Sequence, residues 1–265
     1  MKPAFTTDEN RVQIYQEDVL VFLQALPDES VDVIVTDPAY SGMNQKLQLG
    51  SGKIIGVYKE KGRETARWFE EFHDTLENYQ AFLTECKRVL RKDRHLYLMF
   101  DSFSLLSLAP IVREIFEVKN ILCWDKVNIG MGHYFRRRHE FILFASKGKR
   151  KLNSKSIPDI WPVKRVSRAA YPTQKPTEVF RLMLHASAAP GFVVCDPFVG
   201  SGSSAIAALQ EDCQFIGCDI ADKSIELTGQ RIRTFLETGK DPLQPKSLLA
   251  DEYLANIVLK NASKL

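Results

Sequence analysis

The chain has 265 residues, of which 45% are hydrophobic and 26% charged, and its formal net charge is +3. This length and composition are those of a soluble globular protein with one large α/β domain. No apolar run approaches membrane-spanning length, and the first residues lack the core of a signal peptide, so we expect a cytoplasmic protein without membrane contact. The five cysteines have no metal-type spacing, so we expect reduced thiols and no metal.

The positive charge is concentrated between Lys126 and Lys175. Thirteen Lys or Arg residues there face only Glu140 and Asp159, a local balance of +11 that leaves −8 for the remainder. A basic segment on an acidic body is typical of a protein that binds a polyanion such as nucleic acid. A solvated charged loop is the alternative interpretation.

The first predicted elements are a strand over residues 12–15 and a short helix over 19–26. Asp18 lies between them, where it either caps the helix or faces a ligand at the end of the strand. Turn residues 27–30 then lead into the next strand.

The central strand is predicted for residues 31–36, because Val-Asp-Val-Ile-Val-Thr is rich in β-branched residues. Pro38 cannot donate to a sheet ladder, so the strand should end before it. Asp37, Pro38 and Tyr40 then lie at the carboxyl edge, where open α/β sheets bind ligands. A carboxylate, a fixed carbonyl and an aromatic ring suit a planar ligand with an amino group.

The next segment, residues 41–78, is rich in glycine and basic residues and predicts little regular structure. It is either a mobile loop that closes over substrate or a surface insertion without a role. Helices are then expected at 79–90 and 103–116, and strands at 95–100, 120–126 and 140–146. The last two strands form an antiparallel pair across an irregular loop.

That loop and the segment after it carry the candidate phosphate contacts. Residues 130–139 mix glycines and aromatics with Arg136, Arg137 and Arg138, which suits contact with phosphate and an unstacked base. A second basic run, Lys149, Arg150 and Lys151, opens the weakly patterned segment 147–170.

The last third of the chain reads as a cofactor site. After the proline-framed stretch 171–177 come a helix at 178–188, a strand at 192–195, a glycine turn at 200–202, a helix at 203–209 and a strand at 214–218 that closes on Asp219. This pattern also satisfies the dinucleotide fingerprint, but too little chain follows for a second mononucleotide half. A helix over 223–236, with Leu236 inward, and a loosely packed tail over 241–265 complete the chain.

Three motifs carry a resemblance to the β group of DNA amino-methyltransferases. Asp37-Pro38-Ala39-Tyr40 resembles their catalytic motif, with Ala39 replacing a second proline. Tyr171-Pro172-Thr173-Gln174-Lys175-Pro176 is similar to their His-Pro-Thr-Gln-Lys-Pro signature, with Tyr171 replacing histidine. Asp196-Pro197-Phe198-Val199-Gly200-Ser201-Gly202 is similar to their cofactor motif.

The order of these motifs implies a circularly permuted class I methyltransferase. Its expected fold is α/β, a Rossmann-like, mostly parallel seven-stranded sheet with an antiparallel edge hairpin in a single domain, 1–265. The implied cofactor is S-adenosylmethionine. The residues assigned to it are Asp18, Thr173, Lys175, Asp196, Phe198, Gly200, Gly202, Ser203 and Asp219.

The implied reaction methylates the exocyclic N6 of adenine in double-stranded DNA, with the target base flipped out and stacked on Tyr40. Asp37 and the Pro38 carbonyl would accept the amino hydrogens. Cytosine N4, RNA or protein amino groups, and a DNA-binding protein that has lost the cofactor are the alternatives. Sequence recognition is expected from short loops, from the candidate insertions 41–78 and 147–170, or from a second subunit in a homodimer.

Overall fold

The computed structural model describes residues 1–38, 75–130, 134–167, 169–171 and 173–259. Within these residues the strands form one nine-stranded sheet. Its strands are β1 (Phe5–Thr6), β2 (Val12–Gln16), β3 (Val31–Thr36), β4 (Leu90–Phe100), β5 (Glu117–Asp125), β6 (His139–Lys147), β7 (Ile160–Pro162), β8 (Val193–Asp196) and β9 (Gln214–Asp219).

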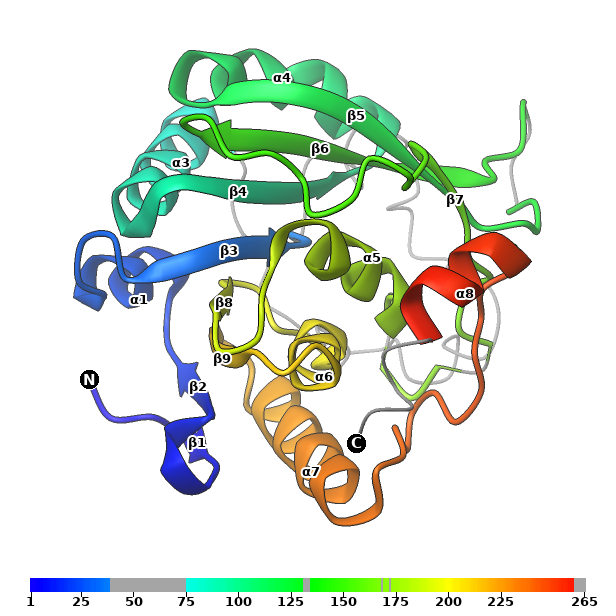
Figure 1. Cartoon of the computed structure of the whole chain (residues 1–265). Coiled ribbons are helices and arrows are strands. Elements are labelled where there is room, and N and C mark those ends of the chain that lie inside the picture. Colours follow the sequence, from blue (N-terminus) through cyan, green and yellow to red (C-terminus); the bar gives the residue numbers. More distant parts are fainter. Residues whose placement is uncertain (39–74, 131–133, 168, 172, 260–265) are drawn as a thin grey trace.

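The helices lie on both faces of this sheet (Figure 1). They are η1 (Asp8–Asn10), α1 (Val19–Ala25), α3 (Leu76–Val89), α4 (Ser102–Ile115), α5 (Thr177–Ser187), α6 (Ser203–Gln210), α7 (Asp222–Thr238) and α8 (Glu252–Leu259). Helices α1, α3 and α4 cover one face, and α5, α6 and α7 cover the other, so the molecule has three layers.

The strand order is β1-β2-β9-β8-β3-β4-β6-β5-β7. From β2 to β4 all neighbours are parallel, whereas β6 runs antiparallel to both β4 and β5. The mostly parallel sheet with an antiparallel β5–β6 pair is therefore confirmed. All seven predicted strands are present, and the short β1 and β7 bring the total to nine.

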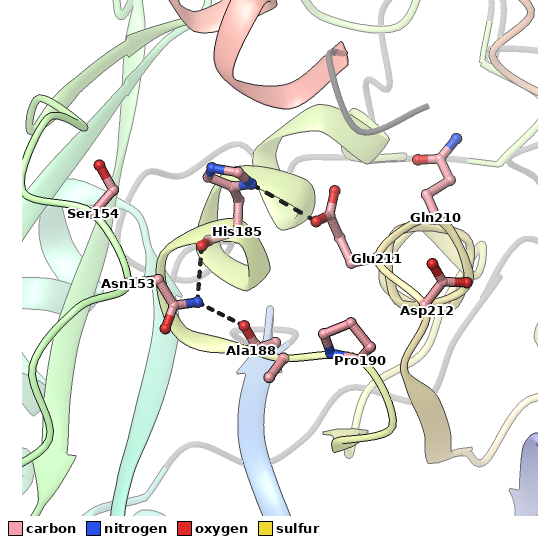
Figure 2. A pocket seen from close by; sticks show the side chains of 9 residues that line it. Asn153, Ser154, His185, Ala188, Pro190, Gln210, Glu211 and Asp212 are labelled. Carbon is pink, nitrogen blue, oxygen red and sulfur yellow. Dashed lines mark hydrogen bonds and ion pairs between the residues drawn. The ribbon is translucent and has the colours of Figure 1, made fainter. Parts of the chain in front are cut away.

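The carboxyl and amino edges of the sheet have different features. Strands β3, β4, β8 and β9 end at the carboxyl edge, where Asp37, Asp101 and Asp219 lie. At the opposite, amino edge, a cavity of about 440 Å³ lies between the ends of α5 and α6 and the loops that enter β8 and β9 (Figure 2). Asn153 closes one side of this cavity, because its amide donates to the carbonyls of His185 and Ala188 at 3.1 and 2.6 Å.

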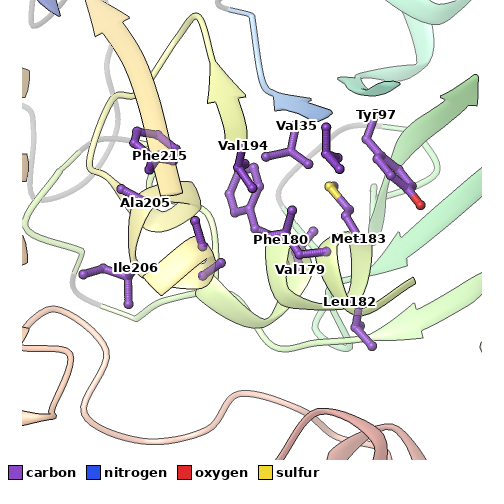
Figure 3. Packing of buried hydrophobic residues seen from close by; sticks show 14 of the residues in the cluster. Val35, Tyr97, Val179, Phe180, Leu182, Met183, Val194, Ala205, Ile206 and Phe215 are labelled. Atoms are coloured by element: carbon purple, nitrogen blue, oxygen red, sulfur yellow. The ribbon is translucent and has the colours of Figure 1, made fainter. Parts of the chain in front are cut away.

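Successive side chains of each strand point to opposite faces of the sheet, and this alternation produces the two hydrophobic cores. In β3, Val33 and Val35 point to one face, and Ile34 points to the other. On the first face Val35 packs with Tyr97 and with Phe180 and Met183 of α5 (Figure 3). Every residue of β3 is buried, as expected for a strand covered on both faces.

Two expectations about the end of the chain are wrong. The segment expected as a loosely packed tail contains α8, whose Leu254 and Val258 are 0% exposed in the core, and Asp241 is buried against α7. Leu236, expected to point inward on α7, is 47% exposed. The buried stripe of that helix includes Ile225 and Ile232, as expected, together with Ser224, Thr228 and Arg231, so polar contacts as well as apolar side chains decide which face is covered.

No helix in the described ranges is long and apolar enough to cross a membrane.

Candidate active site at the carboxyl edge of the sheet

The two halves of the predicted site meet between β3 and β8. These strands are parallel neighbours, with Val33 opposite Val194 and Ile34 opposite Cys195. At their carboxyl ends Thr36 Oγ1 donates a 2.8 Å hydrogen bond to Asp196 Oδ1. Residues 160 positions apart in the sequence are thus in direct contact, and the carboxyl end of β3 lies beside the carboxyl end of β8.

Asp196 organises the turn that follows β8. Its carboxylate is 1% exposed and accepts hydrogen bonds from Thr36, from Phe198 N at 3.0 Å and from Ser204 Oγ at 2.5 Å. Burial raises the pKa of Asp196 to about 6 despite these donors. These three contacts are all within the chain, so the Asp196 carboxylate holds the turn that follows β8 in place.

Asp37 is held by a lysine from the other predicted motif. Lys175 Nζ donates to Asp37 Oδ2 and lies 3.6 Å from Glu140 Oε2, while Lys126 Nζ donates to Glu140 Oε1. The four side chains come from the loop after β3, the loop before α5, the start of β6 and the end of β5. They form one continuous chain of alternating charge at the carboxyl edge.

This charge chain changes the titration of its members. Burial raises the pKa of Asp37 above its usual range, with Lys175 offsetting part of the rise. Burial also acts to raise the pKa of Glu140, but the two lysines outweigh it and lower that pKa. For Lys175, burial opposes the charge, yet both carboxylates raise its pKa, so the ammonium stays protonated.

The glycine turn after β8 has the backbone that only glycine adopts easily. Gly200 and Gly202 have φ values of 52° and 79°. A Cβ on Gly202 would lie 2.6 Å from Cγ2 of Thr228, so this position also needs space for the approach of α7. Thr228 Oγ1 in turn donates to the Gly200 carbonyl at 2.9 Å. Gly202 then caps α6, which begins at Ser203.

Asp219 closes the turn from the end of β9. Its Oδ2 accepts from Gly200 N at 2.9 Å and its Oδ1 from Ala221 N at 3.0 Å. Burial raises its pKa. Tyr171, the residue that replaces the family's histidine, lies against Gly200 and shares a 3.0 Å hydrogen bond with Ser224. The turn is therefore supported from the β9 end, from α7 and from the loop before α5.

Arg231 joins the glycine turn to the end of the chain. It is 1% exposed and donates to Ser201 O at 2.8 Å, to Ser203 Oγ at 3.0 Å and to both oxygens of Asp241 at 2.8 and 2.6 Å. Ser203 Oγ donates onward to the carbonyl of Lys175 at 2.7 Å. The backbone at Lys175 is thereby fixed to the turn while its ammonium reaches Asp37.

These residues fit an adenosine-type cofactor with an amino-acid end. Lys175 offers a cation, and both polar side-chain atoms of Gln174, which is 7% exposed, lack a hydrogen-bond partner within the described part of the chain. Thr173 is exposed beside them, with a φ of 60°. A buried polar group without a partner indicates a missing ligand.

Two other cofactor candidates have structural partners. Asp18 caps α1, accepting from Leu20 N at 2.8 Å and Val21 N at 3.3 Å, so the capping interpretation is confirmed. Phe198 packs edge-on against Phe82 of α3, with ring centroids 5.6 Å apart. Tyr40, like Ala39 of the same motif, lies outside the described residues.

The loop between β5 and β6 begins at the same edge of the sheet as Asp37. We call it the arginine loop, because its described residues include Arg136, Arg137 and Arg138. Its aromatic side chains Tyr134 and Phe135 are 94% and 102% exposed. Arg136 is exposed and donates to Gly130 O at 2.7 Å, and the Arg137 guanidinium lies 5.0 Å from the ring of Phe103 at the start of α4. Arg138 binds both oxygens of Asp125, which neutralises much of its charge.

The second basic run does not lie with this loop. Lys149 N donates to Asp93 Oδ1 at 2.7 Å, and the Arg150 guanidinium lies 5.2 Å from the Phe192 ring, so both are at the amino edge beside the cavity of Figure 2. Lys151 follows them there. Val33–Thr36 of β3 pair with His95–Leu98 of β4, so Asp93 lies before this paired stretch and Asp37 after it. The second basic run is therefore roughly 15–20 Å from Asp37 along the sheet.

Segment 147–170 nevertheless returns to the active-site edge. After β7, which runs parallel to β5, Lys164 N donates to Leu248 O at 2.7 Å. Arg165 Nη2 then lies 3.5 Å from the carbonyl of Ile129 in the arginine loop. Lys164 and Arg165, both exposed, therefore lie on the same edge of the sheet as Asp37.

Sequence reasoning missed several members of the site. Glu140 and Lys126 were counted only as charges, although an acidic residue at the start of the apolar run 140–146 is a signal that could have been used. Arg231 was missed because the polar residues at Ser224, Thr228 and Arg231 follow helical spacing on a face that was expected to be apolar.

Comparison with known proteins identifies the family. The family model described as DNA methylase matches residues 31–230. Type II methyltransferase M.HhaII of Haemophilus parahaemolyticus is 31% identical over 202 residues, which are 74% of this chain and 85% of the relative. Type II methyltransferase M2.DpnII of Streptococcus pneumoniae is 27% identical over 259 residues, 89% of this chain and 94% of that protein.

Solved structures share the fold. PvuII DNA methyltransferase, described as cytosine-N4-specific, aligns with a TM-score of 0.67 at 15% identity, covering 100% of this chain and 96% of that one. The M1.HpyAVI–SAM complex aligns with a TM-score of 0.58 at 20% identity, and the alignment covers 83% of this chain and 99% of that one. The resemblance seen in the three motifs is thus confirmed, and the chain belongs to the DNA methylase family as an amino-methyltransferase of the β group.

Proposed function

We propose that this protein transfers a methyl group from S-adenosylmethionine to the N6 amino group of adenine in double-stranded DNA. The observation that carries the proposal is the contact between Lys175 and Asp37, since it joins the motif expected to bind the donor to the motif expected to bind the acceptor. The aspartate that opens the motif favours adenine over cytosine by resemblance to the family.

The bound cofactor would supply an electrophilic methyl carbon on a sulfonium, so the protein has to prepare the nucleophile. Asp37 and the Pro38 carbonyl would each accept one amino hydrogen, which orients the nitrogen lone pair. Burial raises the pKa of Asp37 and makes it a stronger base than an exposed aspartate. Asp37 can therefore also take the proton that the amino group releases.

Lys175 and Gln174 are assigned to the amino-acid end of the cofactor, because one is a cation and the other a buried amide without a partner among the described residues. Gly200 and Gly202 would allow close approach of the backbone, with Asp219 at the ribose. Thr173, Ser203 and Phe198 would complete the pocket, while Asp18 and Asp196 would shape its walls.

The DNA would lie across the arginine loop. Arg136 and Arg137, with the exposed aromatic rings beside them, suit phosphate contact next to a flipped base, and Tyr40 is assigned to stacking on that base. Lys164 and Arg165 extend this basic surface. Residues 41–78, or a second copy of the chain in a homodimer, are proposed to read the sequence, and the Type II relatives favour a modification role beside a restriction enzyme.

Nucleoside mass spectrometry tests the proposal. The protein is incubated with unmethylated duplex DNA and S-adenosylmethionine, and the DNA is digested to nucleosides. N6-methyl-2′-deoxyadenosine is the expected product, whereas N4-methyl-2′-deoxycytidine would support the activity named for the PvuII enzyme of the same fold. Methylated RNA or protein with unmodified DNA would refute DNA as the substrate.

A further inference from the structure

One contact at the site conflicts with the chemistry proposed for it. Asp37 is proposed to take a proton from the target amino group, yet the Lys175 ammonium donates to its Oδ2 and lowers its basicity. The side chains of Lys175 and Asp37 are only 13% and 24% exposed. Withdrawing Asp37 from the contact without a replacement would therefore leave a poorly hydrated ammonium with no counter-charge from the protein, which is costly.

The replacement is already close. Glu140 Oε2 lies 3.6 Å from Lys175 Nζ, just beyond hydrogen-bonding distance, so a small rotation of the lysine side chain closes the gap. The rest of Lys175 does not have to move, because its carbonyl is held by Ser203 Oγ. Glu140 is itself held through its other oxygen by Lys126, whose ammonium also lies 5.1 Å from the Trp124 ring.

We propose that Glu140 is a positioning residue that receives the Lys175 ammonium when Asp37 acts as the base for the target amino group. The exchange conserves charge, since Asp37 and Glu140 balance Lys126 and Lys175 in both arrangements. It involves no covalent step. It rests on the proposed function, because it requires Asp37 to take a proton from that amino group.

The inference predicts opposite changes in kcat for variants of Glu140 and of Lys126. In Glu140→Gln the ammonium has only Asp37 as a counter-charge from the protein and stays on it, so we expect kcat at saturating DNA to fall roughly tenfold. In Lys126→Gln the full charge of Glu140 becomes available to Lys175, so we expect kcat to rise. Glu140→Asp keeps the charge and should retain more activity than Glu140→Gln.

A matched control removes an ion pair of similar burial elsewhere. Glu85 pairs with Arg88 on α3, with side-chain exposures of 19% and 28%. Glu85→Gln should leave kcat unchanged. S-adenosylmethionine affinity, measured by calorimetry, should change less than about twofold in Glu140→Gln. A kcat within twofold of wild type in Glu140→Gln, or equal losses in Glu140→Gln and Lys126→Gln, would overturn the inference.

A second readout needs neither DNA nor cofactor. The charged groups around Asp37 are Lys175 from the loop before α5, Glu140 from β6, Lys126 from the end of β5 and Asp196 from β8. Because Glu140 repels the Asp37 carboxylate and competes for Lys175, Glu140→Gln should lower the Asp37 pKa in a carbon-13 NMR titration. An unmoved titration overturns the role of Glu140, whereas absent methyl transfer by the wild type refutes the proposed function instead.

Discussion

Two ion clusters lie close together in this protein and are built differently. Around Arg231 each contact is a hydrogen bond of normal length, and the arginine and Asp241 side chains are 0% and 5% exposed. Around Lys175 the side chains are 13–24% exposed, and one carboxylate lies just beyond bonding distance. In the first cluster every charged group is held by hydrogen bonds, which suits fixing a backbone. In the second, Lys175 has another carboxylate within reach, which suits the exchange of partners that we propose.

The largest expected effect comes from removing the Asp37 carboxylate from the cluster around Lys175. Asp37→Ala should lower methyl transfer by roughly 10³-fold or more, because it removes both the acceptor and the base. Cofactor affinity should stay nearly intact. A tritiated-methyl assay and calorimetry measure the two quantities. Asp93→Ala, at the amino edge, is the control, and wild-type turnover in Asp37→Ala would remove the assignment.

The Arg231 cluster should respond in stability. Arg231→Met leaves the buried Asp241 carboxylate without its partner, so we expect the free energy of unfolding to fall by about 3–5 kcal/mol. Chemical denaturation measures this. The control is Arg11→Met, whose pair with Asp212 is 41% and 52% exposed and should cost less than about 1 kcal/mol. Similar losses in both variants would remove the contrast between the Arg231 and Lys175 clusters.

A smaller effect, which depends on pH, is expected beside Asp196. Its pKa is raised from 3.8 to about 6, so the folded state binds the proton more tightly than the unfolded state, and stability falls as pH rises through this window. Ser204→Ala removes a donor to the ionised form. It should cost about 1.5–3 kcal/mol at pH 8 and less at pH 5.

Denaturation at the two pH values tests this expectation. Thr234→Ala is the control, since its hydroxyl bonds only to Gln230 O on an exposed helical turn. An equal loss at pH 5 and pH 8 in Ser204→Ala would show that Asp196 is not ionised where we expect it to be.

The smallest expected effect distinguishes the basic residues 136–138 from the basic residues 149–151. Arg136→Glu at the active-site edge should weaken DNA binding and flatten the dependence of log K on log salt by about 0.9 per lost phosphate contact. Lys151→Glu, at the amino edge, should leave that slope unchanged. Fluorescence anisotropy across a salt series measures both variants. A larger change in Lys151→Glu would place the DNA on the opposite edge of the sheet.

The sequence allowed the sheet and the main motifs to be predicted, because strand ends are marked locally by Pro38, by the glycines at 200 and 202, and by Asp219. The contacts between motifs could not be read in this way. The bond from Thr36 to Asp196 depends on which strands become neighbours, and local periodicity does not determine that order. The Arg231 cluster could not be predicted for a second reason. An arginine is buried only together with its partners, and those come from distant segments of the chain.

The position of β8 has a consequence for how the chain is made. This strand completes the middle of the sheet by inserting between β3 and β9, although Thr36 and Asp196 are 160 positions apart. At ordinary ribosomal speeds, roughly 8 to 32 s separate the synthesis of these two residues. During that interval one side of β3 has no hydrogen-bonding partner, so the nascent polypeptide carries an open strand edge that favours chaperone capture or self-association until its last third emerges.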